Sequence, residues 1–540
     1  MKNRTGVIIL RIVATIIVVL FILILSLHLY LKKNSPEIFR SYIDKLLKSR
    51  GSIYKIDHNS IDIDLLGGQI VLKNLKISFD EEKLKQSGLK RAMFLKASIP
   101  FLSITGISVS DLVIFRKITA ERILLLRGKL KFYLLKQTGT KKKEISRRGR
   151  LPAINFGGIT IEDTDIEFFT DISKTPISGL KGINLDTGRI ELNPKRKNGK
   201  NFIKRVPALL LNIDNSFIFF KKNGYKANTD LIRFGSAGSS ISIKNFKYAP
   251  ASREILKKRM ALTGKYHLIE IPEINLKNID INELIRSSRF KADQLYFKNP
   301  DIYFFRNKNI KRKKKKNGKK LPQQILRETG LKVDFDLIRI KNGDIKYTEI
   351  AVGEKRGESL IFGELKTSLY NISNFPEILK TGIESEISVS VRLMSKSLLK
   401  AKMMIPINNR AGRFSFSGSL SKTDPSVFNK FLKRNVKIKI DKGKLNYMTF
   451  SVQADKDRAS GSIKLAYNDL HLTLMKKKRS AGKSRFGTFL ANSLTHKNNP
   501  KKRGRKLRTG KIQFKRVEKR SMFDYMWKCI LDGIKSSIKI

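Results

Sequence analysis

Apolar and polar residues alternate along most of the chain, and the pattern is clearest between Ile56 and Phe79. An alternation of period two predicts strands of a sheet that has one apolar face and one polar face. Gly67-Gly68 interrupts the pattern and predicts a tight turn, because glycine adopts positive φ without a steric cost. The apolar residues that the alternation places on one face are Ile61, Ile63, Leu65, Ile70, Leu72, Leu75, Ile77 and Phe79.

Later blocks repeat the design of a strand, a glycine-containing turn and a second strand. These blocks are Ile154 to Phe169, Ile183 to Leu192, Leu337 to Glu349 and Val436 to Val452. Their irregular spacing excludes a solenoid or propeller of fixed period. Short helical patterns lie between the strands, at Ile281 to Ser287, Pro322 to Arg327 and Pro425 to Leu432. We therefore expect a mostly β fold, in which an elongated, curled antiparallel sheet over residues 52–474 forms a groove with short interspersed helices.

The beginning of the chain has a different pattern. The run from Gly6 to Leu31 is almost wholly apolar, with Arg11 as its one charge, and it exceeds the roughly 20 residues that cross a bilayer core. No small-residue cleavage site follows the run, so we expect a retained transmembrane anchor over residues 1–33. A short amphipathic helix is predicted over residues 34–51. Because a long following domain translocates largely regardless of nearby charge, we place the bulk of the chain beyond the membrane.

The end of the chain is predicted to be a basic flexible tail over residues 475–520, followed by an amphipathic helix over residues 521–540. The apolar stripe of this helix comprises Phe523, Met526, Trp527, Ile530 and Ile534. A basic flank beside an aromatic amphipathic helix suits an anionic membrane surface. A helix that caps the end of the sheet accounts for the stripe equally well, and the pattern leaves both interpretations open.

The composition of the chain limits the classes of partner that we expect. The chain has 540 residues, 41% of them hydrophobic, and a formal net charge of +66. It is too long for one compact core, and its charge indicates anionic surroundings such as lipid head groups, acidic glycans or nucleic acid, unless it is simply a solvated basic surface. Basic runs such as Lys141 to Arg150 and Asn307 to Lys320 are interpreted as exposed hairpin loops. Nucleic acid is an unlikely partner for a chain with a transmembrane anchor.

No catalytic motif stands out. The histidines are isolated, no metal-ligand spacing occurs, and no nucleotide-binding loop or nucleophile motif is present. The only cysteine, Cys529, has no histidine near it in sequence and forms no intrachain disulfide. We therefore expect a protein that is not an enzyme and that uses no metal and no cofactor.

The order of these parts resembles the bacterial AsmA-like envelope proteins. The stretch SIDIDLLGGQIVLKNLKIS resembles the strand pair that opens their repeating β-groove. Ile281 to Arg306 resembles their module of a helix, a strand, an Asn-Pro turn and a strand. Phe428 to Leu474 resembles their C-terminal module, with the strand at Gly461 and the Tyr467, Asp469 and Leu470 motif. The family is similar in fold to chorein-type bridge-like lipid-transfer proteins.

This resemblance implies a function. A family member would be anchored in the inner membrane, project into the periplasm and bind or conduct phospholipids along an apolar groove, in support of outer-membrane lipid homeostasis and integrity. The eight alternating apolar residues named above, from Ile61 to Phe79, are then candidates for the groove lining. Phospholipids and the inner membrane are the implied partners, with outer-membrane or other envelope proteins as further candidates. Two rival functions stay open: a structural or assembly factor of the envelope that carries no lipid, and a membrane-tethered polyanion binder.

Overall fold

The computed structural model describes residues 54–64, 68–82, 91–108, 111, 118–136, 154–170, 175–192, 203–205, 208–310, 318–475, 496–502 and 504–538. Strands dominate these ranges, so the prediction of a mostly β fold is confirmed. The predicted anchor from Gly6 to Leu31 and the predicted helix at residues 34–51 lie outside the described residues. Within the described ranges, no helix is long and apolar enough to cross a membrane.

The chain divides into two compact units. Unit 1 comprises Met1–Asn245 and Lys277–Lys291, and unit 2 comprises Phe246–Leu276 and Ala292–Ile540. The strands before this division are β1 (Tyr54–Asp57), β2 (Ser60–Asp64), β3 (Gln69–Phe79), β4 (Arg91–Thr105), β5 (Ile118–Leu126), β6 (Lys129–Lys136), β7 (Ile154–Phe169), β8 (Ser178–Thr187), β9 (Ile190–Leu192), β10 (Ile203–Arg205), β11 (Leu209–Phe220), β12 (Tyr225–Thr229) and β13 (Leu231–Gly235). The strands β14 (Ser240–Pro250), β15 (Lys265–Ile279) and β16 (Arg289–Lys298) are divided between the units.

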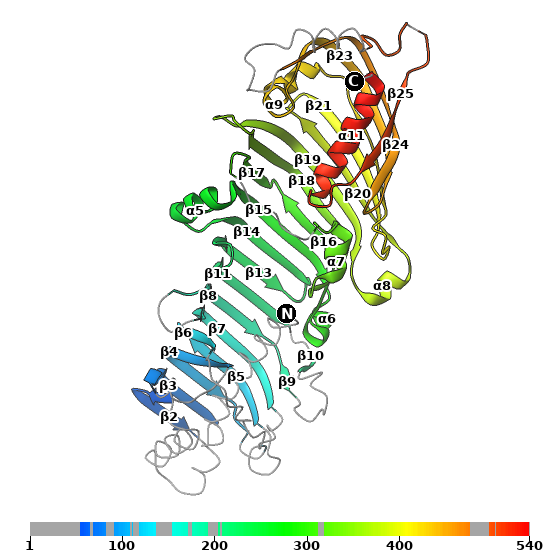
Figure 1. Cartoon of the computed structure of the whole chain (residues 1–540). Helices are drawn as coiled ribbons and strands as arrows, with labels where there is room; N and C mark the ends of the chain where they lie inside the picture. Colours follow the sequence, from blue (N-terminus) through cyan, green and yellow to red (C-terminus); the bar gives the residue numbers. More distant parts are fainter. Residues whose placement is uncertain are drawn as a thin grey trace. The chain divides into compact units, whose positions relative to one another are not determined.

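Unit 2 holds the longest strands and most helices (Figure 1). Its strands are β17 (Asp301–Asn307), β18 (Lys332–Ile350), β19 (Glu358–Ser373), β20 (Glu384–Leu393), β21 (Ser397–Pro406), β22 (Phe414–Leu420), β23 (Ile438–Ala454), β24 (Arg458–Leu474) and β25 (Thr509–Lys515). Its helices are α5 (Arg253–Thr263), α7 (Pro322–Glu328), α8 (Pro376–Lys380), η1 (Pro425–Phe428), α9 (Asn429–Asn435) and α11 (Met522–Ile538). The helix α6 (Ile281–Ser287) belongs to unit 1 and has the predicted bounds.

Two of the described helices were not predicted from the sequence, although one of them has clear signals at both ends. The helix α5 begins after Ser252, whose side chain accepts a hydrogen bond from the Ile255 amide, and ends at Gly264 with φ of 59°. A serine N-cap and a left-handed glycine C-cap are standard signals of helix ends. The other, α8, is a single short turn after Pro376, which starts a helix readily.

The sheet is mixed, which corrects the expected antiparallel arrangement. The strands β5 and β6 both pair antiparallel with β4 and parallel with β7, and β17 pairs parallel with β18. A parallel neighbour requires the chain to return across the sheet before the next strand begins. The basic run Lys141 to Arg150, predicted as an exposed hairpin loop, lies outside the described residues. The run Asn307 to Lys320 is described only at its ends, and it belongs to the connection between the parallel strands β17 and β18, which do not form a hairpin.

The predicted internal hairpins are also corrected. The blocks at Ile154, Leu337 and Val436 each form a single long strand, namely β7, β18 and β23. The block from Ile183 to Leu192 forms β8 and β9, which both pair with β7 and so lie end to end. In contrast, β2 and β3 form the expected hairpin around Gly68, which has φ of 63°.

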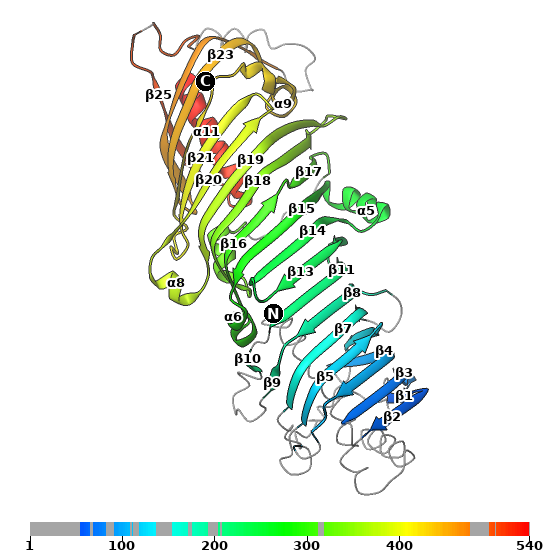
Figure 2. The same cartoon turned by 180° about the vertical axis from the view of Figure 1, so that it is seen from behind.

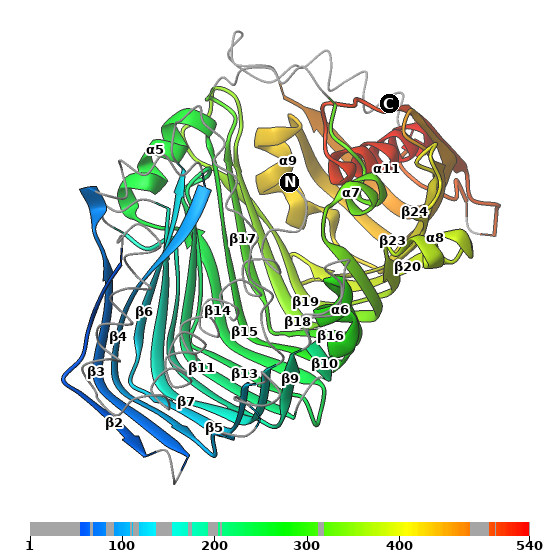
Figure 3. The same cartoon turned by 90° about the horizontal axis from the view of Figure 1, so that it is seen from below.

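Residues with positive φ explain this error. Asp163 in β7, Asn342 in β18 and Gly443 in β23 have φ of 44°, 56° and 142°, and the register shifts beside them. A left-handed residue in a strand produces a bulge that bends the strand and does not reverse it. The same Asn, Asp and Gly residues favour hairpin turns, so the local signal is ambiguous. The result is visible in Figure 3, where the strands of each unit bend along their length.

Unit 1 has a packed core on the apolar face of its first strands. Its buried residues come from β3 to β7 and include Ile70, Ile104 and Phe132, none of which is exposed. The ring of Phe132 stacks on Phe168 at 5.5 Å between ring centroids. Full burial of such side chains stabilises the fold by about 1.5–3 kcal/mol each.

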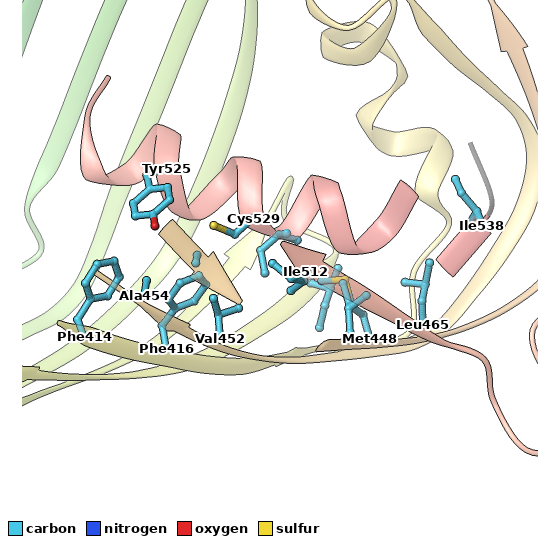
Figure 4. Close-up of a cluster of buried hydrophobic side chains, with 14 of the residues drawn as sticks. Phe414, Phe416, Met448, Val452, Ala454, Leu465, Ile512, Tyr525, Cys529 and Ile538 are labelled. Carbon is cyan, nitrogen blue, oxygen red and sulfur yellow. The ribbon is translucent and has the colours of Figure 1, made fainter. Parts of the chain in front are cut away.

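Unit 2 has a second core, covered by the C-terminal helix. The helix α11 lies inside the curve of the strands and packs on β24 and β25 (Figure 3). Figure 4 shows Tyr525 and Cys529 pointing from the helix toward Phe414, Phe416 and Val452. The helix therefore caps the sheet, which is one of the two interpretations left open by the sequence. The predicted flexible tail is corrected in part, because β25 lies within residues 475–520 and pairs with β24.

Candidate functional site

Most of the predicted groove residues are buried by other side chains of the protein. Ile70, Leu72, Leu75, Ile77 and Phe79 are at most 5% exposed. Ile61 is half-buried and packs against the same cluster. The structure describes the backbone of Ile63 in β2 but not its side chain, and Leu65 lies outside the described residues.

Alternation correctly placed these residues on one face. The phase of the pattern changes at Asn74, which has φ of 54°, and this left-handed residue keeps the apolar side chains on the same face before and after it. Here the apolar side chains of β3 pack against buried side chains of β4 to β7. A charged substitution at Leu72 would therefore test core packing and not an open path.

Unit 1 has a more accessible apolar surface on its later strands. Two cross-strand rows lie here, one over β7, β8, β11, β13 and β14 and one over the last four of these strands, and we call them the aliphatic ladder. The first row is Ile161, Leu185, Leu211, Phe234 and Ile241, and the second is Ile183, Ile213, Ile232 and Ile243. All residues of the first row are half-exposed, whereas Ile183 and Ile213 are buried.

The aliphatic ladder extends the same face as the unit 1 core, because Ile161 packs directly against that core. Five adjacent strands at about 4.8 Å per step give the first row a length of roughly 19 Å. No ladder position carries a charge or a hydrogen-bonding side chain. Such a surface is suited to an extended hydrocarbon and offers nothing that would fix a polar ligand.

Unit 2 carries an aromatic row on the face that α11 covers further along. His267 in β15, Phe304 in β17 and Tyr347 in β18 are neighbours across the strands. Phe304 is 40% exposed. Burial lowers the pKa of His267, and the nearby Arg259 lowers it further, so the imidazole is neutral at neutral pH. The row therefore presents uncharged rings.

A cavity of about 750 Å³ lies within unit 2 near the start of α11. Its basic lining residues are Arg306, Lys308, Arg520 and Lys528, and its acidic lining residue is Asp524. Apolar side chains including Val352 and Phe514 complete the wall. A pocket with several cations beside apolar walls can accept an anionic group that carries a hydrocarbon.

A buried carboxylate organises one wall of this cavity. Glu349 is 4% exposed and pairs with Lys308 and Arg306. The hydroxyl of Tyr347 donates a hydrogen bond to Glu349 at 2.6 Å. Burial raises the pKa of Tyr347, and the bond to the carboxylate raises it further. The phenol therefore stays protonated and keeps its donor at the boundary between the aromatic row and the cations.

The predicted membrane-surface residues fall on two sides of α11. Phe523 and Trp527 are 64% and 39% exposed. Met526 and Ile534 are half-buried against the unit 2 core, and Ile530 is buried. Phe523 contacts Phe362 of β19 edge to face at 6.4 Å. The structure thus divides the predicted stripe, since part of it packs on the sheet and part is exposed.

The structure assigns no metal-binding group to the described residues, where no three or more His, Cys, Asp or Glu side chains cluster suitably. Neither the known protein-family models nor the curated proteins match this chain. The aliphatic ladder was not predicted from the sequence, although its strands show the same alternation. The signal was present in LLLNI, LIRFG and SISIK, and a turn that contains Gly238 joins the last two of these strands.

Proposed function

We propose that this chain is a membrane-anchored, non-enzymatic protein that binds or conducts phospholipids. The observation that carries the proposal is the aliphatic ladder, a half-exposed apolar row on a bent sheet. Each buried CH₂ group of an acyl chain contributes about 0.8 kcal/mol. Many equivalent positions on the ladder allow a bound chain to slide, because no polar contact holds it at one point.

The cation-lined cavity of unit 2 supports the same proposal independently. A phosphate group would be bound by Arg306, Lys308, Arg520 or Lys528, while hydrocarbon would contact the neighbouring apolar wall. The predicted anchor and the resemblance to AsmA-like envelope proteins favour an inner-membrane location, with the bulk of the chain in the periplasm. The proposed role is support of outer-membrane lipid homeostasis and integrity.

A direct experiment is mass spectrometry of lipids that co-purify with the full chain. The variant Leu211→Asp places a charge on the aliphatic ladder, and Asn212→Asp places the same charge on the opposite face of the same strand. We expect Leu211→Asp to reduce the bound phospholipid several-fold and Asn212→Asp to leave it unchanged. Equal lipid content in both variants would exclude the ladder as the binding surface.

The rival function is a structural envelope factor without lipid. It is favoured by the burial of Ile70 and Leu72 and by the position of α11, because both fill the apolar face with protein side chains. If the unmodified protein carries no phospholipid from its own membrane, and labelled phospholipid does not bind it in solution, the structural function is the better explanation.

A further inference from the structure

The face of unit 2 opposite α11 carries two rows of hydroxyl and basic residues. The first row is Arg339, Ser368, Ser388, Lys402, Ser417, Ser451, Ser462 and Lys511. The second row is Lys366, Ser390, Lys400, Ser419, Thr449, Lys464 and Thr509. Every position in both rows is Ser, Thr, Lys or Arg. We call this surface the hydroxyl-lysine face.

Alternation sets the direction of these side chains. Ile463, Val452 and Ile512 are buried beneath α11, so their neighbours Ser462, Ser451 and Lys511 point away from the helix. In the reverse view of Figure 2, strands β20 and β21 lie in front of α11. A hollow of about 840 Å³ lies on the hydroxyl-lysine face, and its lining includes Lys366, Lys400 and Lys402.

The lysines of this face are largely uncompensated. Lys402 pairs with Glu386 at 2.9 Å. Within the described ranges, the structure records no ion pair for Lys366, Lys400 or Lys464. The adjacent cross-strand row is mixed and contains Tyr370, Glu386, Met404, Ser415, Gln453, Ser460 and Gln513. The restriction to hydroxyls and cations is therefore specific to the two rows and is not a general property of the basic surface.

The spacing of the cations indicates the class of ligand. Lys366 and Lys400 lie two strands apart, or about 10 Å, and Lys400 and Lys464 lie three strands apart, or about 14 Å. Duplex DNA carries one charge per about 1.7 Å, which is far denser. The rows contain no apolar side chain to enter a bilayer. They contain no aromatic side chain either, and the nearest rings are Tyr296, which lines the hollow beneath Arg339, and Tyr370 of the adjacent row. Hydroxyls fill the intervals between the cations.

We propose that the hydroxyl-lysine face binds an extended anionic glycan. Its sulfate, phosphate or carboxylate groups would pair with the lysines, and the intervening Ser and Thr hydroxyls would exchange hydrogen bonds with the sugar hydroxyls. A chain with one charge every one or two sugars matches widely separated cations better than a nucleic acid does. This binding surface is on the face opposite the aromatic row and the cation-lined cavity and does not depend on phospholipid binding.

The test compares two triple variants of the full chain, held in nanodiscs of uncharged lipid, at physiological salt. The first variant combines Lys366→Ser, Lys400→Ser and Lys402→Ser. The control combines Lys380→Ser, Lys396→Ser and Lys422→Ser, which removes the same charge from exposed positions of unit 2 outside the rows. The probes are a fluorescent hyaluronan oligosaccharide, which carries one carboxylate per two sugars, an uncharged dextran oligosaccharide, single-stranded DNA and vesicles with 30% anionic lipid.

We expect the first variant to bind hyaluronan about ten-fold more weakly, because three exposed ion pairs together contribute roughly 1.4 kcal/mol. The control should change binding less than two-fold, and dextran should not bind. A variant with Lys→Arg at the three row positions should retain binding and confirms that the charge is required. Equal losses in the first variant and the control would overturn the proposal in favour of non-specific attraction. A larger loss of DNA or vesicle binding than of hyaluronan binding would also overturn it, and would identify a nucleic acid or a membrane as the partner.

Discussion

The aliphatic ladder of unit 1 and the core beneath α11 in unit 2 share one sequence pattern but differ in accessibility. In both regions, apolar residues alternate with polar residues along adjacent strands. Leu211 and Phe234 of the ladder are half-exposed, whereas Ile463 and Val452 are at most 1% exposed. The pattern therefore specifies an apolar face and leaves open what covers it.

Small residues distinguish the covered region. A Cβ atom added to Gly510 of β25 would lie 2.2 Å from the carbonyl oxygen of Gly533 in α11. A Cβ added to Gly533 would lie 2.7 Å from Ile512 and 2.8 Å from Ile463. The two glycines thus allow the helix backbone to approach the strand closely. Every position of the aliphatic ladder is occupied by Ile, Leu or Phe. These larger side chains would keep a helix backbone further from the strands.

The largest expected effect comes from placing a carboxylate in each region. Ile463→Asp buries a charge under α11 without a partner, and we expect a loss of several kcal/mol with cooperative unfolding. Leu211→Asp places the charge on a half-exposed surface, so its denaturant midpoint should fall much less. Chemical denaturation followed by circular dichroism measures both. Similar denaturant midpoints for the two variants would contradict the difference in burial between Ile463 and Leu211.

The sequence sufficed for the strand-rich fold and for the apolar face of β3, because period-two alternation has one physical interpretation. Hairpins were wrongly predicted around Asn342 and Asp163. A residue with a left-handed conformation can bend one strand or reverse the chain between two strands, and its local conformation is the same in both cases. Pairing between distant strands, such as the parallel pair of β17 and β18, has no local signal. The cover provided by α11 depends on a contact between Gly510 and Gly533 that only the folded chain reveals.

The next largest effect on stability is expected from a methyl group added where α11 contacts β25. We expect Gly510→Ala to destabilise unit 2 by about 1–3 kcal/mol, because the added Cβ overlaps the backbone of α11. Gly235→Ala in β13 is the matched control, since its Cβ would contact only Leu210 at an ordinary 3.6 Å. Denaturant midpoints measure both variants. An unchanged midpoint for Gly510→Ala would show that α11 shifts on the sheet without cost.

A smaller effect should be equal in the two units, because both use left-handed residues to shape their strands. Asn74 in β3 and Asn342 in β18 have φ of 54° and 56°. Replacement of either by Ala should cost about 1–2 kcal/mol, because a side chain without a local hydrogen bond is disfavoured in this conformation. Replacement by Gly should cost less at both positions. If Ala and Gly behaved alike at one position, the left-handed conformation there would not be required.

The smallest expected effect concerns the buried thiol of Cys529, which reports whether α11 stays packed on the sheet. Cys529 is not exposed, and burial, with a contribution from the charge of Asp532, raises its pKa from the ordinary value of 9.0 to about 12. The folded protein therefore holds the thiol proton more tightly than the unfolded chain. The stability that this provides is complete below pH 9 and is lost as the pH rises from 9 to 12, because only the unfolded chain ionises in that window.

The denaturant midpoint should fall more steeply above pH 9 in the natural protein than in Cys529→Ala, where lysine titration is the same but the thiol is absent. At pH 8, alkylation of the folded protein should be about ten-fold or more slower than in denaturant, because the thiolate is the reactive form and the site is covered. Rapid alkylation of the folded protein would mean that α11 leaves the sheet readily. The apolar face of unit 2 would then be as accessible as the aliphatic ladder, and the distinction between the two regions would be lost.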